Sequence, residues 1–118
     1  MKERLKYAEL APKGVQALDP IEAYLHECGL DEGLIELVKT KASQINGCAY
    51  CLDMHTKNAR AQGETEQRLY ALNAWRETPF FSERERAALA WTEAVTCVSE
   101  GHVPDDVYEL VRKDFDQK

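Results

Sequence analysis

Two cysteines and a histidine, Cys48, Cys51 and His55, stand close together in the run Asn46-Gly-Cys-Ala-Tyr-Cys-Leu-Asp-Met-His55. On a helix, with about 100° per residue, Cys51 lies roughly 60° and His55 roughly 20° from Cys48, so all three side chains share one stripe. Thiolates attack peroxides and disulfides, and they also bind metals. The residue types and their spacing therefore predict redox or metal chemistry.

The expected position of Cys48 favours a reactive thiol. We expect a helix over residues 47–62 with Asn46 as its N-cap, which places Cys48 in the first turn, beside unpaired N–H groups and the positive end of the helix dipole. His55 can take up or pass on a proton from the same face. Cysteines three residues apart can also bond across one helical turn. A reversible disulfide is therefore feasible.

Glu36 is a candidate partner for His55, because it lies on the preceding expected helix, twelve residues before Cys48. A carboxylate there could orient the imidazole. Most helical glutamates are solvated, so the sequence leaves a functional and a solvated Glu36 equally open. Cys28 and Cys97 stand alone, and we expect them to be small buried apolar residues.

Length and composition restrict the class of protein. A chain of 118 residues predicts a single domain over residues 1–118. The formal net charge of −6, with 15 Lys and Arg scattered among acids, argues against a nucleic-acid partner. No apolar run reaches the roughly 20 residues needed to cross a membrane, and no signal peptide is recognisable. We therefore expect a cytoplasmic protein. Because the cytoplasm is reducing, a close cysteine pair there indicates catalysis or metal binding more than a structural disulfide.

The periodicity of apolar residues predicts an all-α fold, a bundle of about six helices with the Cys-x-x-Cys pair at the N-terminus of a central helix. The first ten residues are expected to form an irregular arm. Ser82-Glu-Arg-Glu85 is a capping-box sequence. The expected helices span residues 15–28 with a start or kink near Asp19, 31–46, 47–62, 65–78, 82–101, and from 104 to about 115. Expected buried positions on the long helix after Ser82 include Ala88, Leu89, Trp91, Ala94, Val95 and Val98.

The pattern Glu36-x11-Cys48-x2-Cys51-x3-His55 resembles the signature of the alkylhydroperoxidase AhpD-like proteins, within the larger carboxymuconolactone decarboxylase-like superfamily. The similarity extends over roughly residues 5–100 and includes the segments Lys39–Cys48, Gly63–Leu69 and Phe81–Trp91. As a combined pattern it is specific, whereas Cys-x-x-Cys alone is only suggestive.

The resemblance implies an AhpD-like helical fold and an antioxidant, peroxiredoxin-type oxidoreductase that reduces small alkyl hydroperoxides with a dithiol. By analogy, Cys51 attacks the hydroperoxide and Cys48 resolves the sulfenic acid as a redox-active disulfide, while Glu36 and His55 relay protons. The implied reductant is a lipoyl group or a thioredoxin-like protein, and no cofactor or metal is expected. Relatives assemble as trimers or hexamers, so the resemblance also implies a homo-oligomer.

The chain departs from the family pattern at two places. Tyr50 stands between the cysteines, where the best-characterised relatives have a histidine. A tyrosine there can donate a hydrogen bond but is a poor base near neutral pH, and a plain aromatic filler beside the site is the simpler interpretation. We also expect the chain to lack the last C-terminal helix of its relatives. Tyr50 thus weakens the expectation of strong peroxidase activity, whereas the predicted fold does not depend on this residue.

Three alternatives to a peroxidase stay open. The first is a thiol-disulfide oxidoreductase or redox sensor without strong peroxidase activity. The second is a zinc-binding structural module, in which Cys48, Cys51, His55 and either Glu36 or Cys28 hold the metal. The third is lactone decarboxylation or another cofactor-free reaction on the same fold, because a fold does not fix a function.

Overall fold

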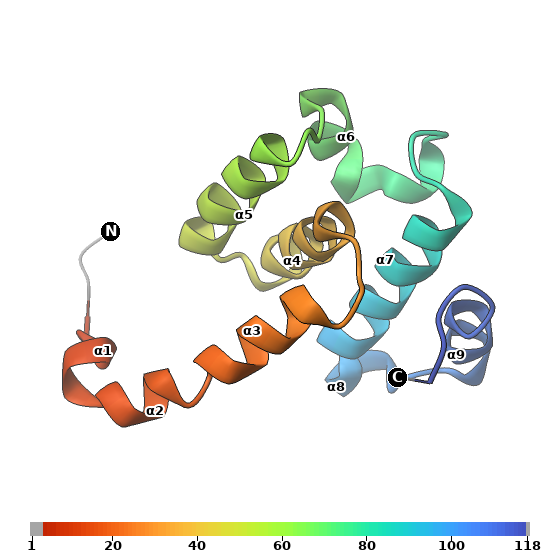
Figure 1. Cartoon of the computed structure of the whole chain (residues 1–118). Coiled ribbons are helices and arrows are strands. Elements are labelled where there is room, and N and C mark those ends of the chain that lie inside the picture. The colour runs from red at the N-terminus through yellow and green to blue at the C-terminus, as the bar shows by residue number, and fades with distance from the viewer. Residues whose placement is uncertain (1–3, 118) are drawn as a thin grey trace. The chain divides into compact units, whose positions relative to one another are not determined.

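The computed structural model describes residues 4–117, and the regular structure in that range is helical throughout, as the apolar periodicity predicts (Figure 1). The chain forms two compact units, one ending at Asp31 and one beginning at Glu32. None of the helices in the described range is long and apolar enough to cross a membrane.

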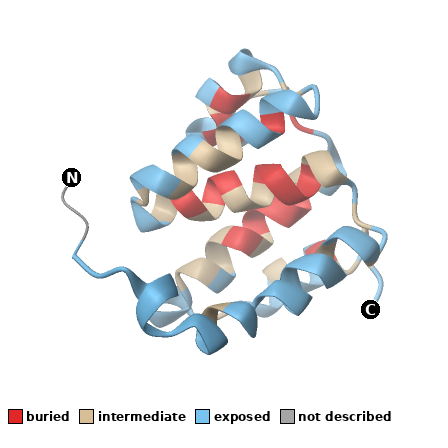
Figure 2. Cartoon of the chain, turned by 60° about the vertical axis from the view of Figure 1, so that its left-hand side comes forward, coloured by how far each residue is buried: buried red, intermediate tan, exposed pale blue. Residues whose placement is uncertain are grey.

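The first unit is a series of short helices, α1 (Tyr7–Leu10), α2 (Pro12–Gln16) and α3 (Asp19–Glu27). The expected irregular arm is therefore wrong for residues 7–10, which form one helical turn, and residues 1–3 of that arm lie outside the described range. The predicted start near Asp19 is confirmed, because Pro20 falls in the first turn, where a missing N–H costs no helical hydrogen bond. No residue of α1, α2 or α3 is buried (Figure 2).

The second unit holds the core. Its helix α4 (Glu32–Asn46) packs against both α5 (Ala49–Ala61) and α7 (Glu83–Thr96), so that α4 lies between them (Figure 1). The remaining elements are α6 (Glu66–Ala71), the 3-10 helix η1 (Leu72–Glu77), α8 (Val98–Gly101) and α9 (Asp105–Val111), and α9 packs on α7. The central cluster consists of Leu37, Leu72, Trp75, Phe81, Leu89 and Ala90. This packing fixes α4, the helix that carries Glu36.

The predicted capping box starts α7. The Glu85 N–H donates to Ser82 Oγ (3.2 Å), and the Ser82 N–H donates to Glu85 Oε2 (2.7 Å). Burial alone would raise the pKa of the Glu85 carboxyl, but hydrogen bonds from Arg68 and Ser82 outweigh burial and lower that pKa overall. One turn later, the Arg86 guanidinium donates to the carbonyl oxygens of Trp75, Arg76 and Thr78. The start of α7 is thereby tied to the end of η1.

Two expected helices are each broken in the structure. The helix over residues 65–78 divides into α6 and η1, and the backbone leaves helical geometry at Ala74 (φ −113°, ψ 32°). The helix over residues 82–101 divides into α7 and α8 at Cys97 (φ −99°, ψ 31°). Val98, which follows the break, is 49% exposed, and Val95, in the last turn of α7 before it, is 46% exposed, so neither is buried as expected.

The last helix is also shorter than expected. It ends at Val111, and Phe115 lies beyond it with its ring under the Arg84 guanidinium, 4.0 Å from the ring centroid. The periodicity of apolar residues predicts a helix through Phe115, because Phe115 follows Val111 by four residues and continues the apolar stripe of this helix. The cation–π contact with α7 stabilises a different path for the chain.

Candidate active site

Cys48 and Cys51 are joined in a disulfide at the start of α5, with their Cα atoms 5.3 Å apart. The expected N-cap, Asn46, is wrong, because Asn46 is the last residue of α4. Cys48 itself has extended backbone geometry (φ −86°, ψ 98°), and its Sγ accepts the Cys51 N–H at 3.3 Å. The helix therefore begins at Ala49, and a disulfide sulfur serves as its cap.

Gly47 makes this tight link between α4 and α5 possible. Its φ of +63° lies in the left-handed region, which a glycine adopts at little cost. The chain then turns so that the Cys48 N–H donates to the carbonyl oxygen of Ser43 at 3.1 Å. As a result, the disulfide is held against the last turn of α4.

Glu36 and His55 meet across the packed faces of α4 and α5. The distance from His55 Nδ1 to Glu36 Oε2 is 2.8 Å, and the side chains are only 14% and 8% exposed. A carboxylate accepts hydrogen bonds, so this pairing favours an N–H at Nδ1 and leaves Nε2 as the ring nitrogen that can exchange a proton. Burial of a carboxylate without a hydrogen-bonding partner is costly, so His55 stabilises Glu36 in its buried position. The pair is therefore part of the interior packing and not a solvated surface pair.

The structure thus joins the four predicted residues in two pairs, the Cys48–Cys51 disulfide and the Glu36–His55 hydrogen bond. Cys51 and His55 lie four residues apart on α5 and share a face of that helix. Hydroxyl groups near Glu36 on α4 are already used, since Thr40 Oγ1 donates to the Glu36 carbonyl oxygen and Ser43 Oγ to that of Lys39, both at 2.7 Å. These hydroxyls therefore do not occupy the Glu36 carboxylate, which keeps His55 as its partner.

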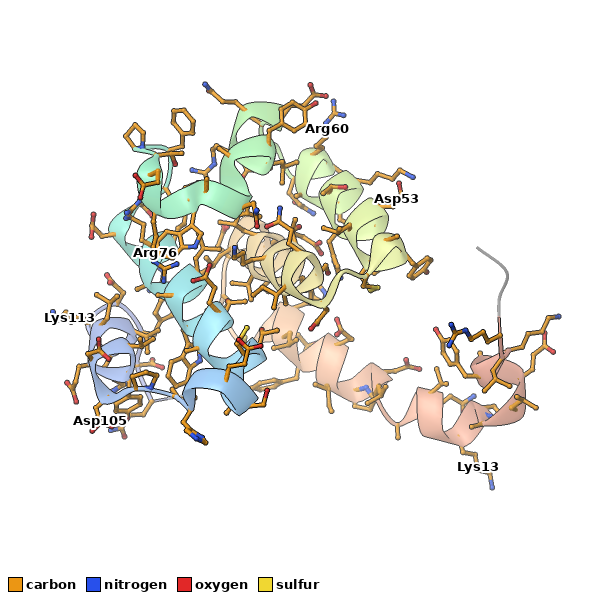
Figure 3. The ribbon with its side chains drawn as sticks, turned by 180° about the vertical axis from the view of Figure 1, so that it is seen from behind. Lys13, Asp53, Arg60, Arg76, Asp105 and Lys113 are labelled. Atoms are coloured by element: carbon orange, nitrogen blue, oxygen red, sulfur yellow. A yellow bond between two sulfur atoms is a disulfide. The ribbon has the colours of Figure 1, made fainter. Side chains whose placement is uncertain are left out.

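Tyr50 is not the aromatic filler that the sequence suggests, because its side chain is 73% exposed. It lies in the first turn of α5, between the two bonded cysteines. One turn further, Asp53 points away from α4 (Figure 3) and pairs at the surface with Lys57 at 2.7 Å. The exposed side chains of α5 beside the disulfide are therefore Ala49, Tyr50 and Asp53, and Met54, one turn after Tyr50, is partly exposed.

A second buried polar cluster, centred on Glu93, joins α4 to α7 and η1. Lys41 Nζ lies 3.0 Å from Glu93 Oε1 and its side chain is 5% exposed, while Trp75 Nε1 donates to the same oxygen at 2.9 Å. Arg76 pairs with the other carboxylate oxygen. Burial alone would raise the pKa of Glu93, but hydrogen bonds from Arg76, Trp75 and Lys41 lower it overall. Sequence reasoning missed this cluster because its members are far apart in the chain and follow no short motif.

The two remaining cysteines are free thiols and partly exposed, contrary to the expectation that they are buried. Cys28 Sγ donates to the Leu25 carbonyl oxygen at 3.2 Å. Cys97 lines an open cavity of about 520 Å³ together with His102 and Val107. Between residues 4 and 117, no three His, Cys, Asp or Glu side chains are grouped so that they could hold a metal ion. The zinc alternative therefore finds no ligand set in that range.

Comparison with known proteins identifies the family of this chain. The sequence model of the carboxymuconolactone decarboxylase family matches residues 11–94, most of the chain. The chain belongs to this family. Family membership agrees with the AhpD-like helical fold. A redox function is compatible both with this family and with the Cys48–Cys51 disulfide.

A solved structure from the family supports the fold directly. The crystal structure of an Agrobacterium tumefaciens protein of unknown function, described as a candidate antioxidant defence protein AhpD, superposes with a TM-score of 0.93 at 42% sequence identity. The match covers 98% of this chain and 80% of that protein.

Two curated relatives have no characterised function. YdfG of Bacillus subtilis (strain 168) is 43% identical over 118 residues, which is all of this chain and 80% of the relative. YnjA of Escherichia coli (strain K12) is 31% identical over 67 residues, which is 57% of this chain and 37% of the relative. The name of neither relative states a substrate.

Proposed function

We propose that this protein is a thiol-dependent hydroperoxide reductase that cycles between a Cys48–Cys51 dithiol and the disulfide seen in the structure. The observation that carries the proposal is the buried Glu36–His55 hydrogen bond, which ends on the same face of α5 as one of the disulfide sulfurs. A purely structural disulfide needs no buried acid–imidazole pair beside it. A peroxidase does, because its thiol must lose a proton and its leaving group must gain one.

The reaction begins with the dithiol form. The Cys51 thiolate attacks the terminal oxygen of the hydroperoxide, so an S–O bond forms, the O–O bond breaks and the alkoxide leaves as the alcohol after taking up a proton. The product on the protein is the Cys51 sulfenic acid. The Cys48 thiol loses its proton and attacks that sulfur, the S–O bond breaks as the disulfide forms, and the leaving hydroxide takes up this proton and departs as water.

His55 and Glu36 manage the protons of these steps. The His55 imidazole accepts the proton of the Cys51 thiol and returns it to the departing oxygen. Glu36 fixes the orientation of the ring through Nδ1 and stabilises the imidazolium that forms during the transfer. Two protons and two electrons from an external dithiol, carried by a lipoyl group or a thioredoxin-like protein, restore Cys48 and Cys51.

Stopped-flow oxidation of the reduced protein tests the proposal. Hydrogen peroxide and an organic hydroperoxide are each mixed with the dithiol form, and disulfide formation is followed by mass. The expected result is oxidation much faster than that of a free thiol, with one disulfide formed per peroxide consumed. Oxidation no faster than that of a free thiol overturns the peroxidase proposal.

Substitution of Glu36 by glutamine tests the relay. Glutamine keeps the shape of the side chain but loses the charge that stabilises imidazolium, so we expect the oxidation rate by peroxide to fall on the order of 10²-fold, the scale of general acid–base catalysis. The matched control is Glu77→Gln, which removes an exposed carboxylate on η1. Equal rates in the wild type, the control and Glu36→Gln would show that Glu36 has no part in proton transfer.

A second candidate function is thiol-disulfide exchange without strong peroxidase activity, as in an oxidoreductase or a redox sensor. The exposed Tyr50 favours it, because the residue between the cysteines supplies no base near neutral pH. In that case the disulfide reacts with dithiols, while peroxide oxidises the reduced protein slowly. The stopped-flow measurement separates the two functions.

We also propose that the chain acts as a homo-oligomer, a trimer or a hexamer. The support lies in the first unit, where none of residues 4–31 is buried. Its large apolar residues that are more than half exposed are Leu5, Tyr7, Leu10, Leu18, Ile21 and Tyr24. Apolar surface of this extent is typical of chains that cover it in an assembly.

A further inference from the structure

We propose that the open cavity beside α7 is a binding site for an aliphatic carboxylate, with the carboxylate group at Arg76 and the carbon chain on the apolar wall. The cavity has a volume of about 520 Å³, which lies in the range of small-molecule sites. Its lining includes none of the four residues of the proposed peroxidase mechanism. The inference therefore does not depend on the proposed function.

Three cations but only one carboxylate are gathered where Arg76 lines the cavity. Arg76 and Lys41 both pair with Glu93. Arg86 lies over the Trp75 ring, 5.1 Å from its centroid, and donates to main-chain carbonyl oxygens. Among residues 4–117, no other acidic side chain pairs with any of these three cations. This part of the protein thus has an excess of positive charge, in a chain whose formal net charge is −6.

Arg76 is the cation of this group that a ligand in the cavity can reach. Its side chain is 55% exposed and lines the cavity, whereas that of Lys41 is 5% exposed. The Arg76 guanidinium lies over the Trp75 ring, 4.2 Å from the centroid, and its Nη1 donates to Glu93. Within the described residues, its Nε and Nη2 have no acceptor. These two atoms form one edge of the guanidinium, which can donate two parallel hydrogen bonds to a single carboxylate.

The rest of the lining favours a ligand with an aliphatic chain. The residues of the apolar wall come from α4, α7 and the region of α9, and they are Ile45, Ala90, Ala94, Pro104 and Val107. Glu100 also lines the cavity, but it follows Glu93 by seven residues, roughly 10 Å along a helix. This separation exceeds the screening length of about 8 Å at physiological salt, so Glu100 repels a carboxylate at Arg76 only weakly.

Calorimetric titration with octanoate tests the proposal, with acetate and octylamine as comparisons. We expect saturable binding of one octanoate per chain. Acetate should bind more weakly, by about fourfold for each buried CH₂ group that it lacks. Octylamine, which has the same chain and the opposite charge, should show no saturable binding.

Substitution of Arg76 by glutamine tests the charged end of the site. Arg76→Gln is expected to weaken octanoate binding by about tenfold or more, because it removes a charge-assisted hydrogen bond. Arg60→Gln is the matched control, since the Arg60 side chain is 58% exposed and pairs with Glu66. Arg60 lies on α5, apart from Arg76 (Figure 3). The control should bind octanoate as the wild type does.

The thiol of Cys97 reports where octanoate binds, because Cys97 lines the cavity. The oxidised protein is alkylated with iodoacetamide with and without octanoate, and the labelled peptides are quantified by mass. We expect octanoate to slow the alkylation of Cys97 and to leave that of Cys28, the other partly exposed free thiol, unchanged. Ala94→Phe places a ring in the cavity and is expected to abolish both binding and protection.

Several outcomes would overturn the proposal. Equal affinity for octanoate and octylamine, or equal octanoate affinity in Arg76→Gln and Arg60→Gln, would show that Arg76 does not hold the carboxylate. Protection of both thiols alike, or of neither, would contradict the cavity as the site. Absence of saturable octanoate binding rules the site out, including the case in which a second copy of the chain covers the cavity. No peroxide or reductant is used, so failure of the peroxidase proposal is recognised separately.

Discussion

Substitution of Cys51 by serine is expected to abolish peroxide consumption, with the rate falling to that of the buffer control. The reason is that Cys51 lies on the His55 face of α5, where its thiol can transfer a proton to the imidazole held by Glu36. A serine hydroxyl at this place cannot be oxidised by peroxide. The measurement is peroxide loss with dithiothreitol as the reductant, at matched protein concentration.

Cys48→Ser gives the complementary result. Its Cys51 thiol is expected to react once with peroxide and stop at the sulfenic acid, seen as an added oxygen by mass and trapped by dimedone. Cys97→Ser is the matched control, because Cys97 is a partly exposed free thiol and is expected to keep full turnover. If Cys51→Ser retains turnover while Cys48→Ser loses it, the order of attacker and resolver is reversed. Full activity in both variants would rule out the disulfide mechanism.

The candidate site could be predicted from the sequence to an unusual extent because most of it is local. Cys51 and His55 stand one turn apart on α5, so helical geometry alone places them on one face, and Cys48 is the residue that caps this helix. Glu36 could be proposed only as a possibility, since the pairing of α4 with α5 depends on tertiary packing. The cap of α5 was misplaced because Asn is a better N-cap by statistics than Cys, and no pattern shows that Gly47 turns the chain one residue later.

Glu93→Gln is expected to lower the free energy of unfolding by about 2–4 kcal/mol, a large effect for one oxygen-to-nitrogen change. The substitution leaves the almost fully buried Lys41 ammonium without a charged partner, and removing one member of a buried pair costs about 3–5 kcal/mol. We place the value lower because Glu93 keeps about a quarter of its side chain exposed. Urea denaturation measures the change, with the exposed Glu109→Gln on α9 as the control.

Acid and a second substitution sharpen this test. The native pKa of Glu93 lies below its ordinary value of 4.5, so its charge stabilises the fold above about pH 4.5, and this contribution is lost as the pH falls through the native pKa. The stability difference between wild type and Glu93→Gln should therefore shrink below that pH. The double variant Lys41→Met/Glu93→Gln, which buries no unpaired charge, should recover part of the loss. A Glu93→Gln cost equal to that of the control would contradict the buried-pair interpretation.

The fold can be predicted where the sequence carries a periodic or local pattern. It cannot be predicted where tertiary contacts determine the path of the backbone. The apolar stripes give the all-α class, and the capping box places the start of α7 at Ser82 and Glu85. The breaks at Ala74 and Cys97 follow from backbone angles that no residue type there demands. The Glu93 cluster is invisible in the sequence for the same reason, because its cations come from helices brought together only by folding. The predicted single domain stays a prediction, as does the cytoplasmic location.

In the proposed function, the sulfur that caps α5 is also a sulfur that gains and loses electrons. Cys48 Sγ accepts the Cys51 N–H in the disulfide form, and a thiolate at the same place would be a stronger acceptor, stabilised by the helix dipole. The start of the helix and the oxidation state of the protein are therefore thermodynamically linked. Any free energy with which the first turn prefers the thiolate over the disulfide raises the reduction potential, by about 30 mV for each 1.4 kcal/mol. A contact that tightens or frays this one turn changes how readily the whole protein accepts electrons.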